Sequence, residues 1–195
     1  MDRAQLATAV GISQGTLQHS DTDWLKFAYE GKILFRPIKA FRHSISWNAI
    51  NSANCVYGGS GGRTVTKDGK QYRVRLMRGA ITDPSKNQDS DRGAHGSEWN
   101  RLMLPIHDQV RSGNWSYPAY VESGIPDWGI GFTDVDLVTH QTHGNGSYVL
   151  CQETLGSVIG SRIYRGRGGV SDSGWGAPSV ADTTRGWAPV LELIQ

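Results

Sequence analysis

Glycine is the residue that most constrains how this chain can fold. It occupies 25 of the 195 positions, about 13%, against about 7% in an average protein. From Gly113 onward, 14 glycines occur in 83 residues. Glycine weakens the interior of helices and strands and adopts the backbone conformations that tight turns need. The second half of the chain is therefore expected to consist of short strands between long irregular loops.

The first half carries clearer signals for strands. A strand is expected over residues 33–36, entered through a turn at residues 30–32 and stopped by Pro37, which cannot continue a hydrogen-bonded ladder. The pair Asp68-Gly69 stands between two alternating runs, a pattern typical of a tight hairpin turn. Residues 63–79 are therefore predicted to form two antiparallel strands.

Two helices are also predicted. Ser44 or Ser46 could cap the first, which opens at Trp47 and ends near residue 54. Ser97 is the expected cap of the second, and Pro105 should distort it or end it early. Together with the strands, these helices indicate an α+β protein.

Residues 1–22 are predicted to form an N-terminal arm or docking segment outside the main core, with a short helical stretch at residues 4–10. Polar residues and glycines follow that stretch, and chain termini of this kind often contact neighbours in an assembly. Residues 23–195 are expected to form the domain itself.

The charge balance and apolar runs exclude some functions. Twenty basic and 18 acidic side chains give a net charge of +2. The densest basic cluster, Arg73, Arg75 and Arg78, alternates with apolar residues as one strand face would, so a nucleic-acid groove is not indicated. No run of about 18 apolar residues is present, which argues against membrane insertion, and the first residues lack the apolar segment of a cleaved export signal.

The two cysteines offer little chemistry. Cys55 and Cys151 stand 96 positions apart without metal-type spacing. A disulfide is one reading, and two buried thiols is the favoured one.

One cluster contains metal-ligating residue types. His140 and His143 follow Asp134 and Asp136 closely, and imidazole and carboxylate can share a divalent ion. The two histidines lie in a glycine-rich loop without helical spacing, and the two aspartates are expected to alternate on a strand. A solvated loop is therefore favoured, with bound calcium as the main alternative and no other cofactor expected.

The stretch RGRGG at residues 165–169 has two interpretations. Glycine lets backbone donors approach a phosphate, but the spacing fits no known phosphate loop. We favour a structural role in which the glycines pack the last strands and Arg165 pairs with a buried acid. No GxSxG nucleophile motif is present, so catalysis by a serine is not indicated.

The seven tryptophans divide into two groups. Four occur in apolar or helical runs and are expected in the core: Trp24, Trp47, Trp99 and Trp187. The others lie in glycine-rich loops, where aromatic rings can stack on sugars or anchor a protein partner. With two neighbouring tyrosines, these form the candidate contact residues: Trp115, Trp128, Trp175, Tyr117 and Tyr120.

The C-terminal segment, RIYRGRGGVSDSGWGAPSVADTTRGWAPVLELIQ, resembles the end of the formylglycine-generating-enzyme (sulfatase-modifying factor) family. In that family an RGGSW-like stretch precedes a terminal strand, and the fold is a variant of the C-type-lectin domain. Ser46-Trp47 and Glu98-Trp99 are similar to helix starts in the same family. Ala188 departs from the pattern, because relatives usually carry arginine there.

The span from Trp24 to the end is still more similar to small lectin-like domains of tailed-bacteriophage virion proteins, in which WLKF and GWRPVLEL-like segments recur. The resemblance implies a C-type-lectin-like domain with short antiparallel strands, two helices and long glycine-rich loops. It implies a location in the virion, after synthesis in the host cytoplasm, with other virion proteins as partners and an oligomeric arrangement in the particle.

The resemblance implies a non-enzymatic function. The expected function is a structural part of a tail fibre or baseplate that contacts a host surface glycan or protein. The alternative is a capsid or tail decoration (cement) protein that docks through its N-terminal arm. A formylglycine-type oxidase is less favoured, because that family has a reactive cysteine pair after the RGGSW-like stretch, and this chain has no cysteine after Cys151.

Overall fold

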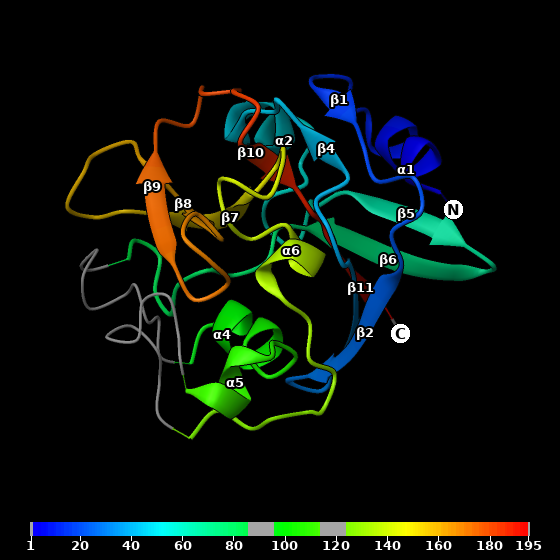
Figure 1. Ribbon diagram of the computed structural model, residues 1–195. Helices are drawn as coiled ribbons and strands as arrows, with labels where there is room; N and C mark the ends of the chain where they lie inside the picture. Colours follow the sequence, from blue (N-terminus) through cyan, green and yellow to red (C-terminus); the bar gives the residue numbers. More distant parts are fainter. Residues whose placement is uncertain (1, 86–95, 114–123, 195) are drawn as a thin grey trace.

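Two β-sheets dominate the computed structural model, which describes residues 2–85, 96–113 and 124–194 (Figure 1). The six-stranded sheet contains, in spatial order, β1 (Thr16–Leu17), β4 (Arg42–His43), β10 (Arg185–Trp187), β7 (Tyr148–Thr154), β8 (Arg162–Arg165) and β9 (Ser173–Gly176). The five-stranded sheet contains β2 (Trp24–Tyr29), β3 (Lys32–Pro37), β11 (Val190–Ile194), β6 (Lys70–Arg75) and β5 (Thr64–Lys67). Short helices accompany the sheets: α1 (Arg3–Val10), α2 (Trp47–Ser52), α4 (Glu98–Met103), α5 (Gln109–Ser112) and α6 (Asp134–Leu137). The α+β class is confirmed.

The local signals for strands and helices are confirmed. The hairpin β5–β6 turns at Asp68 and Gly69, whose φ angles of 52° and 74° are the left-handed values that a two-residue hairpin turn needs. The Ser46 hydroxyl accepts the N–H of the third residue of α2, and the Ser97 hydroxyl does the same for α4. The strand expected before Pro37 is β3.

The last two strands connect the sheets. Trp187 ends β10 in the six-stranded sheet, and Val190 begins β11 in the five-stranded sheet only three positions later. Both side chains are buried. Three of the four tryptophans expected in the core are buried: Trp47, Trp99 and Trp187. Trp24 is partly buried against the cluster that contains Trp47 and Trp187.

The expectation that residues 1–22 lie outside the core is wrong. Leu6, Ala7 and Val10 of α1 are buried in the same apolar cluster as Val65 of β5. The reason is that these three residues share one face of a helix, which packs against β5 at the edge of the five-stranded sheet. The guanidinium of Arg42 further holds the chain after α1 by donating to the backbone carbonyls of residues 13–15 at 2.8–3.0 Å.

Two details of the expected strands also differ. β10 pairs with β7 in parallel, so the strands are not all antiparallel. Residues 134–137 form the helix α6 and not a strand. The Thr133 hydroxyl accepts the N–H of Asp136 and the Asp136 carboxylate accepts the N–H of Thr133, which is a capping box that starts a helix.

The expected pairing of Arg165 with a buried acid is also wrong. The guanidinium is fully buried, and within the described ranges its hydrogen-bond partners are the neutral oxygens of Gly79, Asn100 and Ser171. Burial lowers its pKa to about 10. Carbonyl oxygens can take this place because a guanidinium offers five donors in fixed directions. Arg165 therefore ties β8 to the segment after β6 and to α4.

Cys55 and Cys151 are separate buried thiols. This confirms the interpretation that the sequence favoured. In the part of the chain that the structure describes, no helix is long and apolar enough to cross a membrane.

Candidate functional site

The candidate contact residues do not gather at one place. Trp128 is 46% exposed and follows α5, whereas Trp175 is 36% exposed and lies in β9, at the edge of the six-stranded sheet. Trp115, Tyr117 and Tyr120 lie outside the described residues. The two described tryptophans line different hollows, which we compare in turn.

Trp128 stands in an apolar groove of about 230 Å³. The groove is lined by Ala28, Tyr29, Asn100, Arg101, Leu102, Pro105, Ile125, Pro126 and Trp128. Pro105 ends α4, and its carbonyl oxygen accepts the N–H of Trp128 at 3.0 Å. The indole ring packs against Phe27 of β2 in a tilted arrangement, with the two ring centroids 6.2 Å apart.

The turn that carries Trp128 is held from both sides. The Asp127 carboxylate accepts the N–H of Gly129 at 2.7 Å and forms an ion pair with Arg111 of α5. These interactions lower the pKa of Asp127, the hydrogen bond from Arg111 most of all. Gly129 and Gly131 have φ angles of 78° and 76°, values that side-chain-bearing residues rarely adopt. The groove is therefore formed before a ligand arrives, which reduces the ordering cost of binding.

The groove can take one ring-sized group. An apolar cavity of about 150 Å³ accepts benzene, and an exposed indole offers a flat face for the apolar side of a sugar or for a partner's side chain. The polar residues of its lining are Tyr29, Asn100 and Arg101. Burial raises the pKa of the Tyr29 phenol, and the neighbouring Glu30 charge adds to this effect, so the hydroxyl remains a neutral donor and acceptor.

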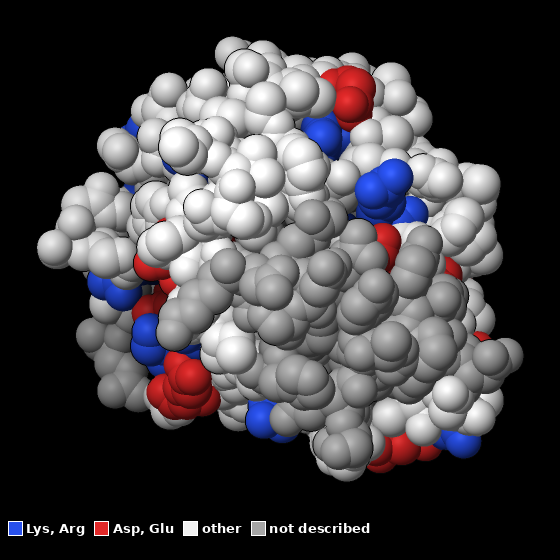
Figure 2. All heavy atoms as spheres, turned by 90° about the vertical axis from the view of Figure 1, so that its left-hand side faces the viewer, with Lys and Arg blue, Asp and Glu red and all other residues white. Residues whose placement is uncertain are grey.

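The hollow beside Trp175 is too small for a ligand. It measures about 10 Å³, roughly the room of a single water molecule. Its walls are Gly79, Ala80, Ser85, Ile163, Ser173, Gly174 and Trp175. Figure 2 views the side of the molecule that carries β9, and the described upper part of this face shows few charged atoms. Trp175 is thus a partly exposed residue of an edge strand.

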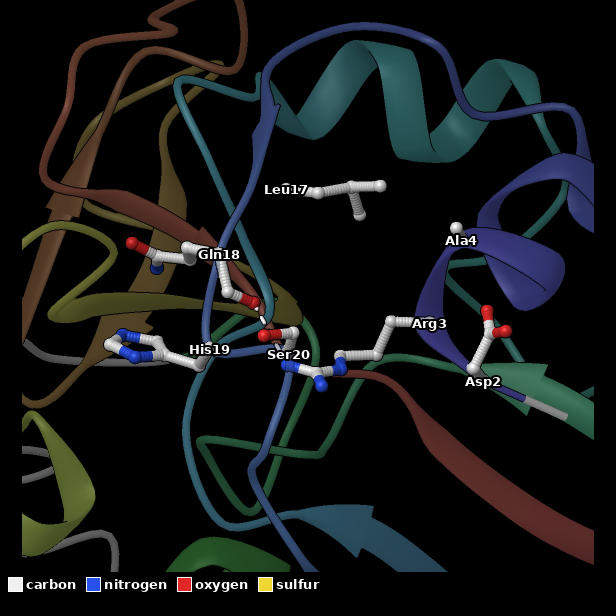
Figure 3. A pocket seen from close by; sticks show the side chains of 7 residues that line it. All are labelled: Asp2, Arg3, Ala4, Leu17, Gln18, His19 and Ser20. Carbon is white, nitrogen blue, oxygen red and sulfur yellow. Dashed lines mark hydrogen bonds between the residues drawn. The ribbon is translucent and has the colours of Figure 1, made fainter.

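A larger cleft lies at the N-terminal segment, between α1 and the chain that follows β1 (Figure 3). It measures about 450 Å³ and is lined by Asp2, Arg3, Ala4, Leu17, Gln18, His19 and Ser20. This cleft could not be predicted from the sequence, because it forms only where α1 lies beside the chain at residues 17–20.

The polar groups of this cleft serve the fold. Arg3 donates to the Gln18 carbonyl oxygen at 3.0 Å, and the Gln18 amide donates to the backbone of Ala40 and Asn145. Burial lowers the pKa of His19, and nearby Lys39 adds to the effect. The cleft therefore offers shape and apolar area more than free charge.

The four residues considered for a metal do not form a shared site. Asp134 accepts the Val170 N–H at 2.6 Å and the Thr139 hydroxyl at 2.7 Å, and lies 3.3 Å from His107 Nε2. Although burial opposes it, hydrogen bonds from His107 and Thr139 lower the pKa of Asp134.

The other three candidates have local roles. Asp136 caps α6, and the rings of His140 and His143 lie against each other with centroids 4.9 Å apart. Within residues 2–85, 96–113 and 124–194, no group of three or more metal-ligating side chains gathers. The imidazole of His107, 3.3 Å from the Asp134 carboxylate, is its nearest histidine partner.

Comparison with known proteins adds no relative: no protein-family model, curated protein or solved structure matches this chain.

Proposed function

We propose that the protein is a non-enzymatic component of a tailed-phage virion, built on a C-type-lectin-like domain, that contacts the host surface through the Trp128 groove. The observation that carries the proposal is the half-exposed indole of Trp128 in a preformed apolar groove. The similarity of residues 24–195 to lectin-like virion domains supplies the biological setting.

The chemistry of the groove favours a glycan or a protein surface as the ligand. Sugar rings present apolar C–H faces that stack on indole, and hydroxyl groups can bond to polar side chains of the lining such as Tyr29. The net charge of +2 is small, so recognition depends on shape and stacking more than on electrostatic attraction.

The state of the thiols argues against a thiol oxidase. Burial raises the pKa of Cys55 to about 12 and that of Cys151 well above its usual value. A thiol oxidase needs a thiolate near neutral pH, and both groups are held in the protonated form.

Binding of the purified protein to bacterial cells and to their surface polysaccharides tests the proposal. We expect Trp128→Ala to reduce binding at least tenfold, because a buried aromatic anchor commonly contributes 2 kcal/mol or more, by rough estimate. Trp175→Ala is the matched control and should bind like the unmodified protein. Equal binding by both variants would remove the groove from the proposal, and binding to no cell or polysaccharide would remove host contact.

A second function is supported by the cleft of about 450 Å³ at the N-terminal segment. In this alternative the protein decorates the capsid or tail and docks through residues 1–22. Leu17, an exposed apolar residue of the cleft, would then contact the particle.

Antibody labelling of intact virions separates the two functions. Label over the head favours decoration, label at the tail end favours host contact, and absence from the particle contradicts both. For decoration, Leu17→Asp should abolish incorporation into particles while Trp128→Ala leaves it unchanged.

A further inference from the structure

The face of the five-stranded sheet that carries Val65, on which α1 packs, also has a second apolar hollow. Phe35 pairs with Leu191 across β3 and β11, and Tyr72 pairs with Val65 across β6 and β5. Residues directly opposite each other project from the same face of a sheet. With Trp24 and Lys67, these residues line a cavity of about 170 Å³, which we call the sheet hollow.

The sheet hollow fits one apolar side chain. A cavity of about 150 Å³ accepts a molecule the size of benzene, and the four carbons of an aliphatic side chain are smaller. Phe35 and Tyr72 form its aromatic wall, with ring centroids 5.9 Å apart in an edge-to-face arrangement.

Lysines surround this face. Lys26 is exposed and lies opposite Phe35, while Lys67 and Lys70 are exposed opposite each other at the hairpin. Lys67 pairs with Asp68 at 2.6 Å. Two copies that met face to face would bring these lysines together, which like-charge repulsion disfavours. The occupant must instead be apolar and free of positive charge.

One projection of the same chain meets these requirements. Ile159 is 100% exposed and, of the large apolar side chains in the described ranges, it alone is fully exposed. It lies in the loop between β7 and β8, and residues 155–161 contain no charged side chain. Backbone hydrogen bonds hold the loop in shape: Leu155 donates to Ser161, Ser161 to Val158 and Val158 to Leu155, at 3.1–3.3 Å.

The projection and the hollow lie on opposite sides of the molecule. In Figure 1 the β7–β8 loop lies at the left and the five-stranded sheet at the right. A single copy cannot bring them together, whereas a second copy can.

We propose that Ile159 of one copy inserts into the sheet hollow of the next, so that the protein associates head to tail. Such an interface joins two different surfaces and generates either a closed ring or an open row of copies. No residue is shared by the linings of the sheet hollow and the Trp128 groove, so the proposal does not depend on host contact. A single buried side chain contributes little against the entropy lost on association. We therefore expect a weak equilibrium that becomes visible at high protein concentration.

Sedimentation velocity over rising concentration tests the proposal. The unmodified protein should show a growing weight-average mass, and Ile159→Asp should remain monomeric. Val135→Asp alters another exposed apolar residue and should associate like the unmodified protein. Tyr72→Arg should block the hollow and prevent association. If Tyr72→Arg does not fold, Leu191→Arg serves as a second variant with the same expected result.

Mixing the defective variants distinguishes a head-to-tail contact from any other. A copy with Ile159→Asp keeps an intact hollow, and a copy with Tyr72→Arg keeps an intact projection. Their mixture should therefore form one-to-one dimers and nothing larger, although each is monomeric alone. Three results would overturn the proposal: an unmodified protein that stays monomeric at its solubility limit, normal association of Ile159→Asp, or a mixture that remains monomeric.

Discussion

Replacing Glu153 with glutamine tests how a buried carboxylate sets the pH dependence of stability. Glu153 lies in β7, is 4% exposed, and accepts the Gly79 N–H at 2.9 Å. Burial raises its pKa to about 7, against a usual 4.5, while the hydrogen bond from Gly79 opposes this rise and the charge of Asp83 adds to it. The carboxylate thus takes up a proton near neutral pH.

The size and sign of the effect follow from this pKa. A tenfold change in proton affinity corresponds to about 1.4 kcal/mol, so ionised Glu153 costs the folded state about 3 kcal/mol. Between about pH 4.5 and pH 7 the folded protein binds more protons than the unfolded chain, so stability falls as the pH rises through this window. Below it, both states are protonated and the cost disappears.

Urea unfolding of Glu153→Gln and of the unmodified protein, at about pH 5 and about pH 8, measures this cost. The amide oxygen of glutamine can still accept the Gly79 N–H, and it carries no charge. Relative to the unmodified protein, the free energy of unfolding of the variant should rise by roughly 2.5 kcal/mol between the lower and the higher pH. Glu30→Gln, which removes an exposed carboxylate paired with Arg78, controls for the loss of one negative charge. The reasoning would be refuted if the free energies of unfolding of Glu153→Gln and the unmodified protein differed by the same amount at both pH values.

Three further changes test other parts of the structure. Glu98→Ala removes the carboxylate that binds the buried guanidinium of Arg75 through two hydrogen bonds, and should lower the free energy of unfolding in urea by about 3 kcal/mol. Asp134→Asn should lower the melting temperature most at neutral pH. The difference in melting temperature between this variant and the unmodified protein should narrow as the pH falls through the lowered pKa of Asp134. At such pH the carboxyl is protonated, and the ionised form no longer stabilises the fold. Gly186→Ala would drive its Cβ into the carbonyl oxygen of Gly146 and should prevent folding, as circular dichroism will show, whereas Gly59→Ala meets nothing within 4 Å and should fold normally.

The sequence predicted those elements whose signals are local. The hairpin at Asp68-Gly69, the caps at Ser46 and Ser97 and the stop at Pro37 each depend on a few adjacent residues. Their backbone conformations are preferred whatever the rest of the chain does.

Long-range packing explains what the sequence did not predict. From the sequence alone, residues 3–10 indicate a short exposed helix, because β5, which covers their apolar face, lies more than 50 residues further along the chain. The neutral partners of Arg165 come from positions 65 and 86 residues away as well as from nearby Ser171. Such contacts depend on how the sheets stack, which no local pattern encodes.

The candidate site shows the same division. Trp128 could be singled out because a tryptophan between glycines has no local core to join. Its groove could not be predicted, since the walls come from β2, α4 and the loop at residues 125–128. Trp175 carried the same sequence signal, yet its hollow has room for little more than one water molecule.

The position of β10 and β11 has a consequence for synthesis on the ribosome. β10 lies between β4 and β7, and β11 lies between β3 and β6, so residues 185–194 supply an interior strand to each sheet. Without them, the strands divide into four separate groups: β1 with β4, β7 to β9, β2 with β3, and β5 with β6. A nascent chain therefore cannot complete either sheet until this segment has left the ribosome. Folding of both sheets is thereby coupled to one late event, and until then their unpaired edges are open to chaperones or to aggregation.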